Sequence, residues 1–137
     1  MKDKALYYID GGSRNNPGEA GIGVVEIIEN VKKGYYQYKG ILTNNEAEYN
    51  ALLKALSLAT EKKIESVEIF TDSELVCNQI NGEYKVKNEK LKELFTKAKE
   101  LIKKIKNFSI THIPREKNKE ADKLVNLAID LKNNGER

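Results

Sequence analysis

The chain has 137 residues, of which 39% are hydrophobic and 33% are charged, with a net charge of +3. That length fits one ordinary domain, and the balanced charge with an ample apolar fraction excludes a disordered chain. The small positive charge is weak evidence for a polyanionic partner. No stretch approaches the roughly 20 apolar residues of a membrane span, and residues 1–30 lack the apolar run of a signal peptide. We therefore expect a cytoplasmic protein that does not bind membranes.

The hydrophobic pattern predicts strands and helices in the order β-β-β-α-β-α-α-β-α. The expected strands span residues 5–9, 21–29, 32–39, 67–70 and 108–113. The expected helices span residues 44–62, 75–80, 89–106 and 118–131. Three strands in a meander followed by strand–helix alternation imply an α/β fold, with a mixed sheet and helices on its faces. We expect one domain over residues 1–131 and a frayed polar tail over residues 132–137.

Local signals mark where several of these elements begin and end. Thr43, with Glu46 three residues later, forms a capping-box pattern at the start of the first helix. Residues 10–18 are a dense cluster of turn residues that should close the first strand. Gly21 and Gly23 indicate a bend or a close backbone approach in the second strand. The only cysteine, Cys77, excludes an internal disulfide, and its apolar neighbours predict that it packs in the core.

Four acidic residues occupy unusual places in this pattern. Asp10 and Asp72 end apolar strands, while Glu48 and Asp122 lie in the first turns of helices. Taken singly, each has an ordinary structural role as a turn residue, a helix cap, a solvated charge or a dipole partner. If the two strands are parallel neighbours, however, their terminal carboxylates converge at the edge where ligands bind. A carboxylate cluster is tolerable when hard cations such as Mg²⁺ neutralise it, and two such ions support phosphoryl transfer.

The same residues stand in motifs that resemble the type 1 ribonuclease H family. The motifs are Tyr-Ile-Asp10-Gly-Gly with Asn16-Pro17-Gly18, Thr43-Asn44-Asn45-Glu46-Ala47-Glu48-Tyr49, Thr71-Asp72-Ser73, and Pro114-Arg115-Glu116-x-Asn118-x-x-Ala121-Asp122. They occur in family order, and the Pro-Arg-Glu pattern is similar to that of archaeal and some bacterial members. The resemblance implies a ribonuclease H-like fold. Its five-stranded mixed sheet would have strands one to three antiparallel and strands four and five parallel to the first.

The resemblance also implies an activity, which is endonucleolytic hydrolysis of the RNA strand of RNA–DNA hybrids with 5′-phosphate and 3′-hydroxyl products. The cofactor would be two Mg²⁺ ions per site, with Mn²⁺ as a substitute. Four residues would bind the metals and act in catalysis, namely Asp10, Glu48, Asp72 and Asp122. The expected partner is the hybrid, with double-stranded RNA as a second candidate and no obligate protein partner.

Further residues would contact the nucleic acid. In the family, the Asn-Asn pair before the catalytic glutamate reaches the minor groove, where the 2′-hydroxyl distinguishes RNA from DNA. The matching positions here, together with the nearby loop and a family pocket for a DNA phosphate, are Gly11, Gly12, Asn16, Thr43, Asn44, Asn45, Ser73 and Asn88. For the Asn pair and Thr43, helix capping is the structural alternative.

The chain departs from the family pattern at several positions. Ile41 and Glu74 stand where an arginine and a glutamine are often found. The passage from Asn81 to Lys90 is too short for the basic handle helix of many members. Between residues 81 and 106 the chain has nine Lys and four Glu. This excess of positive charge indicates either a diffuse phosphate-binding patch or a solvated helix face. The lysines that could form the patch are Lys85, Lys87, Lys90 and Lys92.

Many family members also place a mobile histidine before the last aspartate. Here the candidates are His112 and Arg115, and we favour Arg115 as the residue that holds the scissile phosphate or aids product release. His112 ends an alternating strand, so a structural role accounts for it, while Arg115 could equally pair with acidic neighbours on the surface. Two broader alternatives also stay open: a nuclease that cuts double-stranded RNA as well, and a silent hybrid-binding module. We expect the domain to stand alone rather than to be a fragment of a reverse-transcriptase-type protein.

Overall fold

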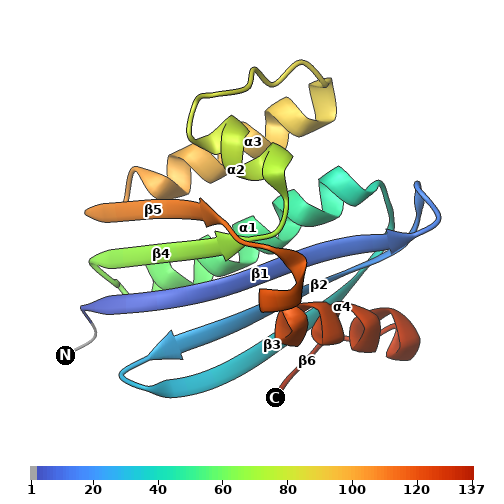
Figure 1. Ribbon diagram of the computed structural model, residues 1–137, viewed down its shortest axis with the longest axis horizontal. Coiled ribbons are helices and arrows are strands. Elements are labelled where there is room, and N and C mark those ends of the chain that lie inside the picture. Colours follow the sequence, from blue (N-terminus) through green and yellow to red (C-terminus); the bar gives the residue numbers. More distant parts are fainter. Residues whose placement is uncertain (1–2) are drawn as a thin grey trace.

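All strands of the molecule belong to one mixed sheet. The computed structural model describes residues 3–137. The strands are β1 (Lys4–Arg14), β2 (Gly18–Ile28), β3 (Val31–Leu42), β4 (Ser66–Thr71), β5 (Asn107–His112) and β6 (Gly135–Glu136). The sheet order is β5-β4-β1-β2-β3-β6 (Figure 1). Strands β1 to β3 form an antiparallel meander, and β4 and β5 run parallel to β1. The expected pairing directions are therefore confirmed.

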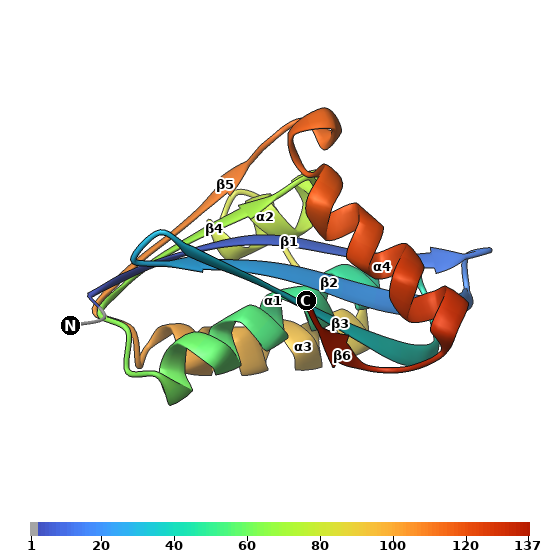
Figure 2. The same ribbon diagram turned by 90° about the horizontal axis from the view of Figure 1, so that it is seen from below.

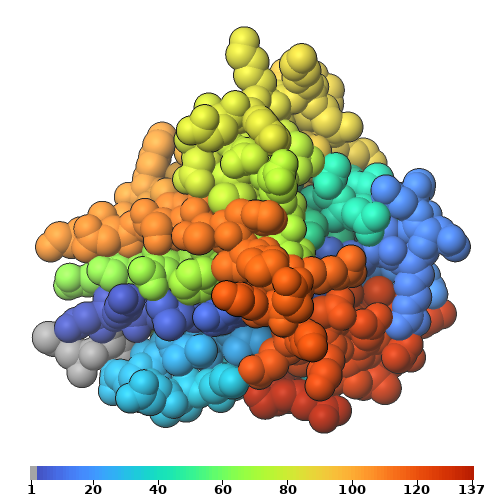
Figure 3. All heavy atoms as spheres, viewed as in Figure 1, coloured from blue at the N-terminus to red at the C-terminus, as the bar shows by residue number. Residues whose placement is uncertain are grey.

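Helices cover both faces of this sheet. They are α1 (Asn44–Glu61), α2 (Glu74–Ile80), α3 (Glu89–Ile102) and α4 (Lys119–Leu131), with a 3₁₀ turn, η1 (Arg115–Lys117), before the last. Helices α1 and α3 pack on one face and α4 on the other (Figure 2). In the space-filling view, α4 and the segment before it lie over the front of the sheet (Figure 3). None of the helices within residues 3–137 is long and apolar enough to cross a membrane.

The first helix begins where its sequence predicts. Thr43 Oγ1 accepts a hydrogen bond from Glu46 N at 3.2 Å, and Glu46 Oε1 accepts one from Thr43 N at 2.9 Å. This reciprocal capping box satisfies two backbone donors that a helix start otherwise leaves unpaired.

The expected helix over residues 89–106 is too long, because α3 ends at Ile102. The chain then turns so that Ile105 can enter the core.

The expected end of the first strand is also wrong. Strand β1 continues through Gly11 and Gly12 to Arg14, and only residues 15–17 form the turn into β2. The sequence pattern predicts turn residues at Gly11 and Gly12, but these glycines pair with Ile22 and Gly21 of β2 in an unbroken antiparallel ladder. Asp10 therefore lies inside a long strand.

The C-terminal tail is ordered into the sheet, which corrects both the frayed tail and the five-strand count. Strand β6 pairs with Tyr35 and Tyr36 of β3, and the backbone N–H groups of Gly34 and Arg137 each donate to the other's carbonyl at 2.7 Å. A two-residue strand has no alternating apolar pattern to reveal it. Its pairing depends on the edge of β3, which is distant in sequence.

Glycines in β2 set how closely α4 approaches the sheet. A Cβ atom added at Gly23 would lie 2.3 Å from the carbonyl oxygen of Ala121 and 2.7 Å from Leu124 Cβ. At Gly21 it would lie 2.9 Å from the carbonyl oxygen of Val125. The close backbone approach predicted for these glycines is confirmed, and a β-bulge between Ala20 and Gly21 accompanies it.

The main core lies between the sheet and helices α1 and α3. Its fully buried side chains include Tyr7, Ile9, Tyr49, Leu52 and Leu56. Cys77 is buried in the same core, which confirms the predicted packing role, and burial raises the pKa of its thiol. A second, smaller cluster holds α4 against β2 and β3.

We expect Gly23→Ala to lower the free energy of unfolding by about 1–3 kcal/mol, because the new methyl group forces α4 away from the sheet. Denaturant unfolding of the purified variant measures this change. Gly12→Ala is the control, since a Cβ there meets only Val125 Cγ1, at an ordinary 3.8 Å. Equal stability of the two variants would show that α4 is not closely seated on β2.

Candidate active site

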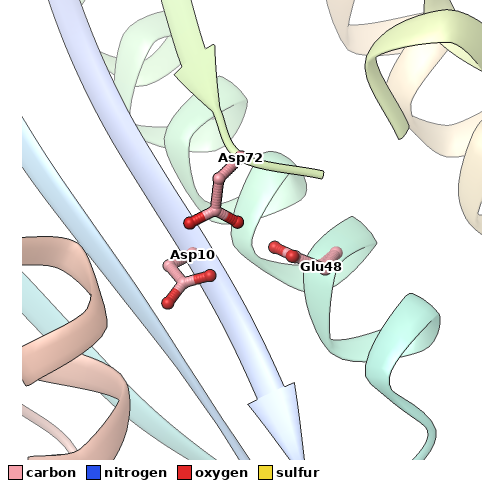
Figure 4. A group of neighbouring side chains, drawn as sticks. All are labelled: Asp10, Glu48 and Asp72. Carbon is pink, nitrogen blue, oxygen red and sulfur yellow. The ribbon is translucent and has the colours of Figure 1, made fainter. Parts of the chain in front are cut away.

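Three carboxylates from distant parts of the chain meet at one place. One oxygen from each of Asp10, Glu48 and Asp72 lies within 4.8 Å of the other two. Figure 4 shows these side chains pointing toward one another from β1, from α1 and from the segment that leaves β4. The predicted convergence of these three residues is therefore what the structure shows.

Strand register explains why the two aspartates are neighbours. The parallel pairing of β1 with β4 ends at the partners Ile9 and Thr71. Asp10 and Asp72 are the next residues on the two strands. Asp72 follows the end of β4, as expected, whereas Asp10 reaches the same level in the middle of β1.

Close packing of α1 against β1 places the third carboxylate, that of Glu48, beside the two aspartates. A Cβ atom added at Gly11 would lie 2.2 Å from the carbonyl oxygen of Ala47, so only glycine allows this approach. The Gly11 N–H donates to Glu48 Oε1 at 2.9 Å. Gly11, which we expected to contact nucleic acid, is thus a buried residue whose N–H orients Glu48.

Asp122 and Arg115 border the same cleft. Asp122 lies in the first turn of α4 and outside the three-residue group, and its Oδ1 is 4.0 Å from Arg115 Nη2. The cleft has a volume of about 380 Å³. Its lining residues are Asp10, Gly11, Gly12, Ser13, Arg14, Asn44, Glu48, Asp72, Arg115, Asp122, Val125, Asn126 and Ile129. His112 is exposed at the end of β5 and does not belong to this lining.

The electrostatics of the cluster are unfavourable without a cation. Burial, followed by repulsion from Asp72 and Asp122, raises the pKa of Asp10 to about 8. Burial also raises the pKa of Glu48 well above its ordinary range, with repulsion from Asp10 and Asp72 adding to it. The Gly11 N–H and the Arg115 guanidinium oppose the shift at Glu48 only in part. The site therefore holds more negative charge than its neighbours compensate.

Asparagines tie the β1–β2 hairpin to the start of α1. Asn44 Oδ1 accepts from the N–H and the hydroxyl of Ser13 at 2.9 and 3.0 Å, and Asn16 Oδ1 accepts from Asn44 N at 2.9 Å. These bonds occupy the two amide oxygens. Within residues 3–137, no partner takes the Nδ2 hydrogens of Asn44 or Asn16. Asn45 is exposed beside them.

Three other predicted contact residues cap helices. Thr43 caps α1, Ser73 Oγ accepts from Val76 N at 3.2 Å in α2, and Asn88 Oδ1 accepts from Leu91 N at 3.1 Å in α3. The starts of α1 and α3 are neighbours, since Lys90 Nζ lies 3.9 Å from Glu46 Oε2. Each capping residue therefore has a structural role that nucleic-acid contact would share.

Sequence reasoning missed several site residues. Arg14 and Asn126 line the cleft, and Asn118 is buried beneath it, with its side chain donating to Asp72 Oδ2 at 3.4 Å. Asn118 belongs to the motif that begins with Pro114, where the sequence pattern predicts only the start of the last helix. Its position in that motif, four residues before Asp122, was the available signal.

Comparisons with known proteins agree with this fold. The family described as reverse transcriptase-like matches residues 8–128. A ribonuclease HI of Halobacterium salinarum is 39% identical over 90% of this chain. The crystal structure of RNase H1 from that archaeon has a TM-score of 0.86 and 37% identity, with 93% of this chain and 98% of that chain covered. LC11-RNase H1, solved with an RNA/DNA hybrid, has a TM-score of 0.87 and 44% identity over 93% of this chain and 98% of that one.

The relatives differ in length from this chain. It spans 63% of the curated Halobacterium protein and 36% of three mycobacterial relatives. The match nevertheless covers nearly all of the sheet and helices described above. The chain therefore belongs to the type 1 ribonuclease H family, within the wider group of reverse transcriptase-like domains.

Proposed function

We propose that the protein hydrolyses the RNA strand of RNA–DNA hybrids, leaving 5′-phosphate and 3′-hydroxyl ends. The observation that carries this proposal is the convergence of Asp10, Glu48 and Asp72 in one open cleft. Relatives named ribonuclease HI support the activity, and a similar structure bound to an RNA/DNA hybrid supports the substrate.

The residues fit a pair of Mg²⁺ ions, with Mn²⁺ as a substitute. The donors are all carboxylate oxygens, which select hard divalent cations, and the raised pKa values of Asp10 and Glu48 indicate uncompensated negative charge. Asp10, Glu48 and Asp72 would hold the metal, with Asp122 as a fourth ligand at the border of the cleft. When bound, such ions supply an activated water and stabilise the leaving oxygen of a phosphodiester.

The chain itself orients this site before any substrate arrives. The N–H of Gly11 fixes Glu48 Oε1, and strand register fixes Asp10 beside Asp72. Arg115 has an exposed guanidinium that lines the cleft, so it can hold the scissile phosphate and assist product release. We assign this role to Arg115 rather than His112 because His112 lies outside the lining.

Amide donors would recognise the minor groove of the hybrid. The Nδ2 groups of Asn44 and Asn16, which have no partner within residues 3–137, are hydrogen-bond donors. The minor groove presents acceptors on bases and on 2′-hydroxyls. Asn45 can both donate and accept there. The backbone of Gly12 in the cleft lining adds a contact, and that of Gly11 can contribute only through its carbonyl.

Phosphate contacts would lie at the neighbouring starts of α1 and α3. Thr43 and Asn88 stand there, and Ser73 begins α2. Ile41 is exposed and offers no charge, so Lys90 and the other lysines of this region would supply the attraction. We propose that residues 1–131 act as one domain in the cytoplasm, with β6 added from the tail.

Double-stranded RNA is the substrate to test against the hybrid. Glu74 stands where a glutamine often contacts the RNA in the family, and Ile41 stands where an arginine often contacts a DNA phosphate. The loss of these contacts would weaken the discrimination between the two duplexes. Parallel assays on both duplexes with the same RNA strand measure the preference. We expect faster cleavage of the hybrid.

Asp10→Asn should abolish cleavage with the fold intact, because it keeps the shape of the side chain but removes a metal-binding charge. We expect at least an approximately 10³-fold loss of rate on a labelled hybrid in Mg²⁺. Circular dichroism and the melting temperature verify that the variant folds. Cleavage at the native rate would refute the catalytic assignment.

The metal-free protein should lose stability as pH rises, because the pKa of Asp10 is raised in the folded state. Between the ordinary carboxyl pKa of about 4 and the folded value of about 8, the folded state keeps a proton that the unfolded state has released. Unfolding therefore becomes easier across this window, and the penalty stays constant above it.

Asp10→Asn removes this penalty, so it should stabilise the metal-free protein at neutral pH by on the order of 1–3 kcal/mol. Added Mg²⁺ should stabilise the native chain more than the variant, since the ion binds the folded cluster. Thermal melts in chelator and in Mg²⁺, at several pH values, measure both effects. A variant less stable than the native chain in chelator would contradict the repulsion.

Asn45→Ala should raise KM for the hybrid about fivefold and leave kcat unchanged, because it removes one exposed hydrogen-bonding group. Steady-state kinetics measure the two constants. Asn107→Ala is the matched control, because Asn107 is also exposed and lies at the start of β5, whereas the carboxylates lie level with the ends of β4 and β5. The minor-groove role fails if the two variants have the same KM.

A further inference from the structure

Asn118 begins α4 without capping it. Asparagine at this position usually accepts a hydrogen bond from the backbone of its own helix. Here, within residues 3–137, the side chain makes no capping bond, although the residue immediately precedes Lys119. The side chain is turned into the protein, and the residue is only 2% exposed. Its amide group therefore serves contacts outside its own helix.

Those contacts join three of the elements that carry the carboxylates. Asn118 Nδ2 donates to the carbonyl oxygen of Ile9 at 2.8 Å, one residue before Asp10. The same nitrogen lies 3.4 Å from Asp72 Oδ2. The backbone carbonyl of Asn118 accepts from the N–H of Asp122 at 3.2 Å. One residue thus connects β1, the end of β4 and the start of α4.

The chemistry of the partners fixes the orientation of the amide. Ile9 O is an acceptor and the Asp72 carboxylate accepts when ionised, so the group facing both must be the NH₂. The oxygen, Asn118 Oδ1, is then buried and accepts no hydrogen bond from any residue of the described chain. A buried acceptor without a partner is unfavourable, so its persistence indicates that the donor side is what this position needs.

We propose that Asn118 is a positioning residue for the metal site. Its NH₂ group orients the Asp72 carboxylate and locks the start of α4 to β1, so that the acidic side chains are held in a metal-binding arrangement. Groups that hydrogen-bond to metal ligands fix the direction of the ligand oxygens and strengthen metal binding. This inference rests on the proposed metal-dependent function.

The test compares variants of Asn118 with a control in another buried amide. Asn118→Leu keeps the branched shape and removes the donor. Asn118→Ser replaces the amide NH₂ with a hydroxyl on a shorter side chain, which takes the donor away from Ile9 O and Asp72 Oδ2. Serine is itself a preferred helix cap, so this second variant favours the fold of α4. The control is Gln79→Leu in α2, because Gln79 is 4% exposed, accepts from Tyr49 OH at 2.6 Å and lies outside the cleft lining.

Calorimetric titration with Mg²⁺ alone is the main readout. We expect both Asn118 variants to bind Mg²⁺ about 10–100-fold more weakly than the native chain. Gln79→Leu should lose stability but keep its Mg²⁺ affinity. In hybrid cleavage, the Asn118 variants should need more Mg²⁺ for half-maximal rate, with KM for the hybrid unchanged.

The outcomes separate the two proposals. Native Mg²⁺ affinity in folded Asn118→Leu and Asn118→Ser, with normal cleavage by the native chain, overturns the positioning role and leaves the proposed function intact. The positioning role is also overturned if Gln79→Leu loses as much Mg²⁺ affinity as the Asn118 variants do. A general structural effect would then explain the loss. If the native chain neither binds Mg²⁺ nor cleaves the hybrid, the proposed function itself fails.

Discussion

Packing, rather than attraction, holds the acidic residues of this protein together. Asp10 and Glu48 repel each other in a partly dehydrated cleft, and isolated buried charges are strongly unfavourable. What keeps them adjacent is the seating of α1 on β1, where Gly11 lets the helix backbone approach and the apolar face of α1 fills the core. The stability of the core therefore offsets the repulsion that a divalent cation would relieve.

The site combines contributions from both faces of the sheet. Helix α1 supplies Glu48 from one face, and α4 carries Asp122 on the other (Figure 2). Each helix is seated by a glycine, Gly11 in β1 and Gly23 in β2, whose missing side chain admits helix backbone. Small residues in two neighbouring strands thus determine the separation of acidic groups that are far apart in the chain.

Features that depend on neighbouring residues were predicted correctly from the sequence, whereas features that depend on contacts between distant residues were missed. The capping box at Thr43 was predicted correctly because a cap depends on neighbouring residues only. The parallel pairing of β4 with β1 was correct as well, but it came from the resemblance to the family and not from the residue pattern. The end of β1 was misplaced because Gly11, which lets α1 approach, lies in a run of residues that is typical of a turn. The side chain of Asn118 was missed as a site residue, because its partner Ile9 lies 109 positions away.

The short pairing of β6 with β3 also has a consequence for the solution behaviour of the protein. Without it, Tyr35 and Tyr36 would offer open backbone hydrogen-bonding groups at the margin of the sheet, where another chain could add a strand. The last residues occupy part of that margin and oppose self-association. A tag or fusion partner joined directly after Arg137 should therefore carry a flexible spacer, so that Arg137 can still bond to Gly34.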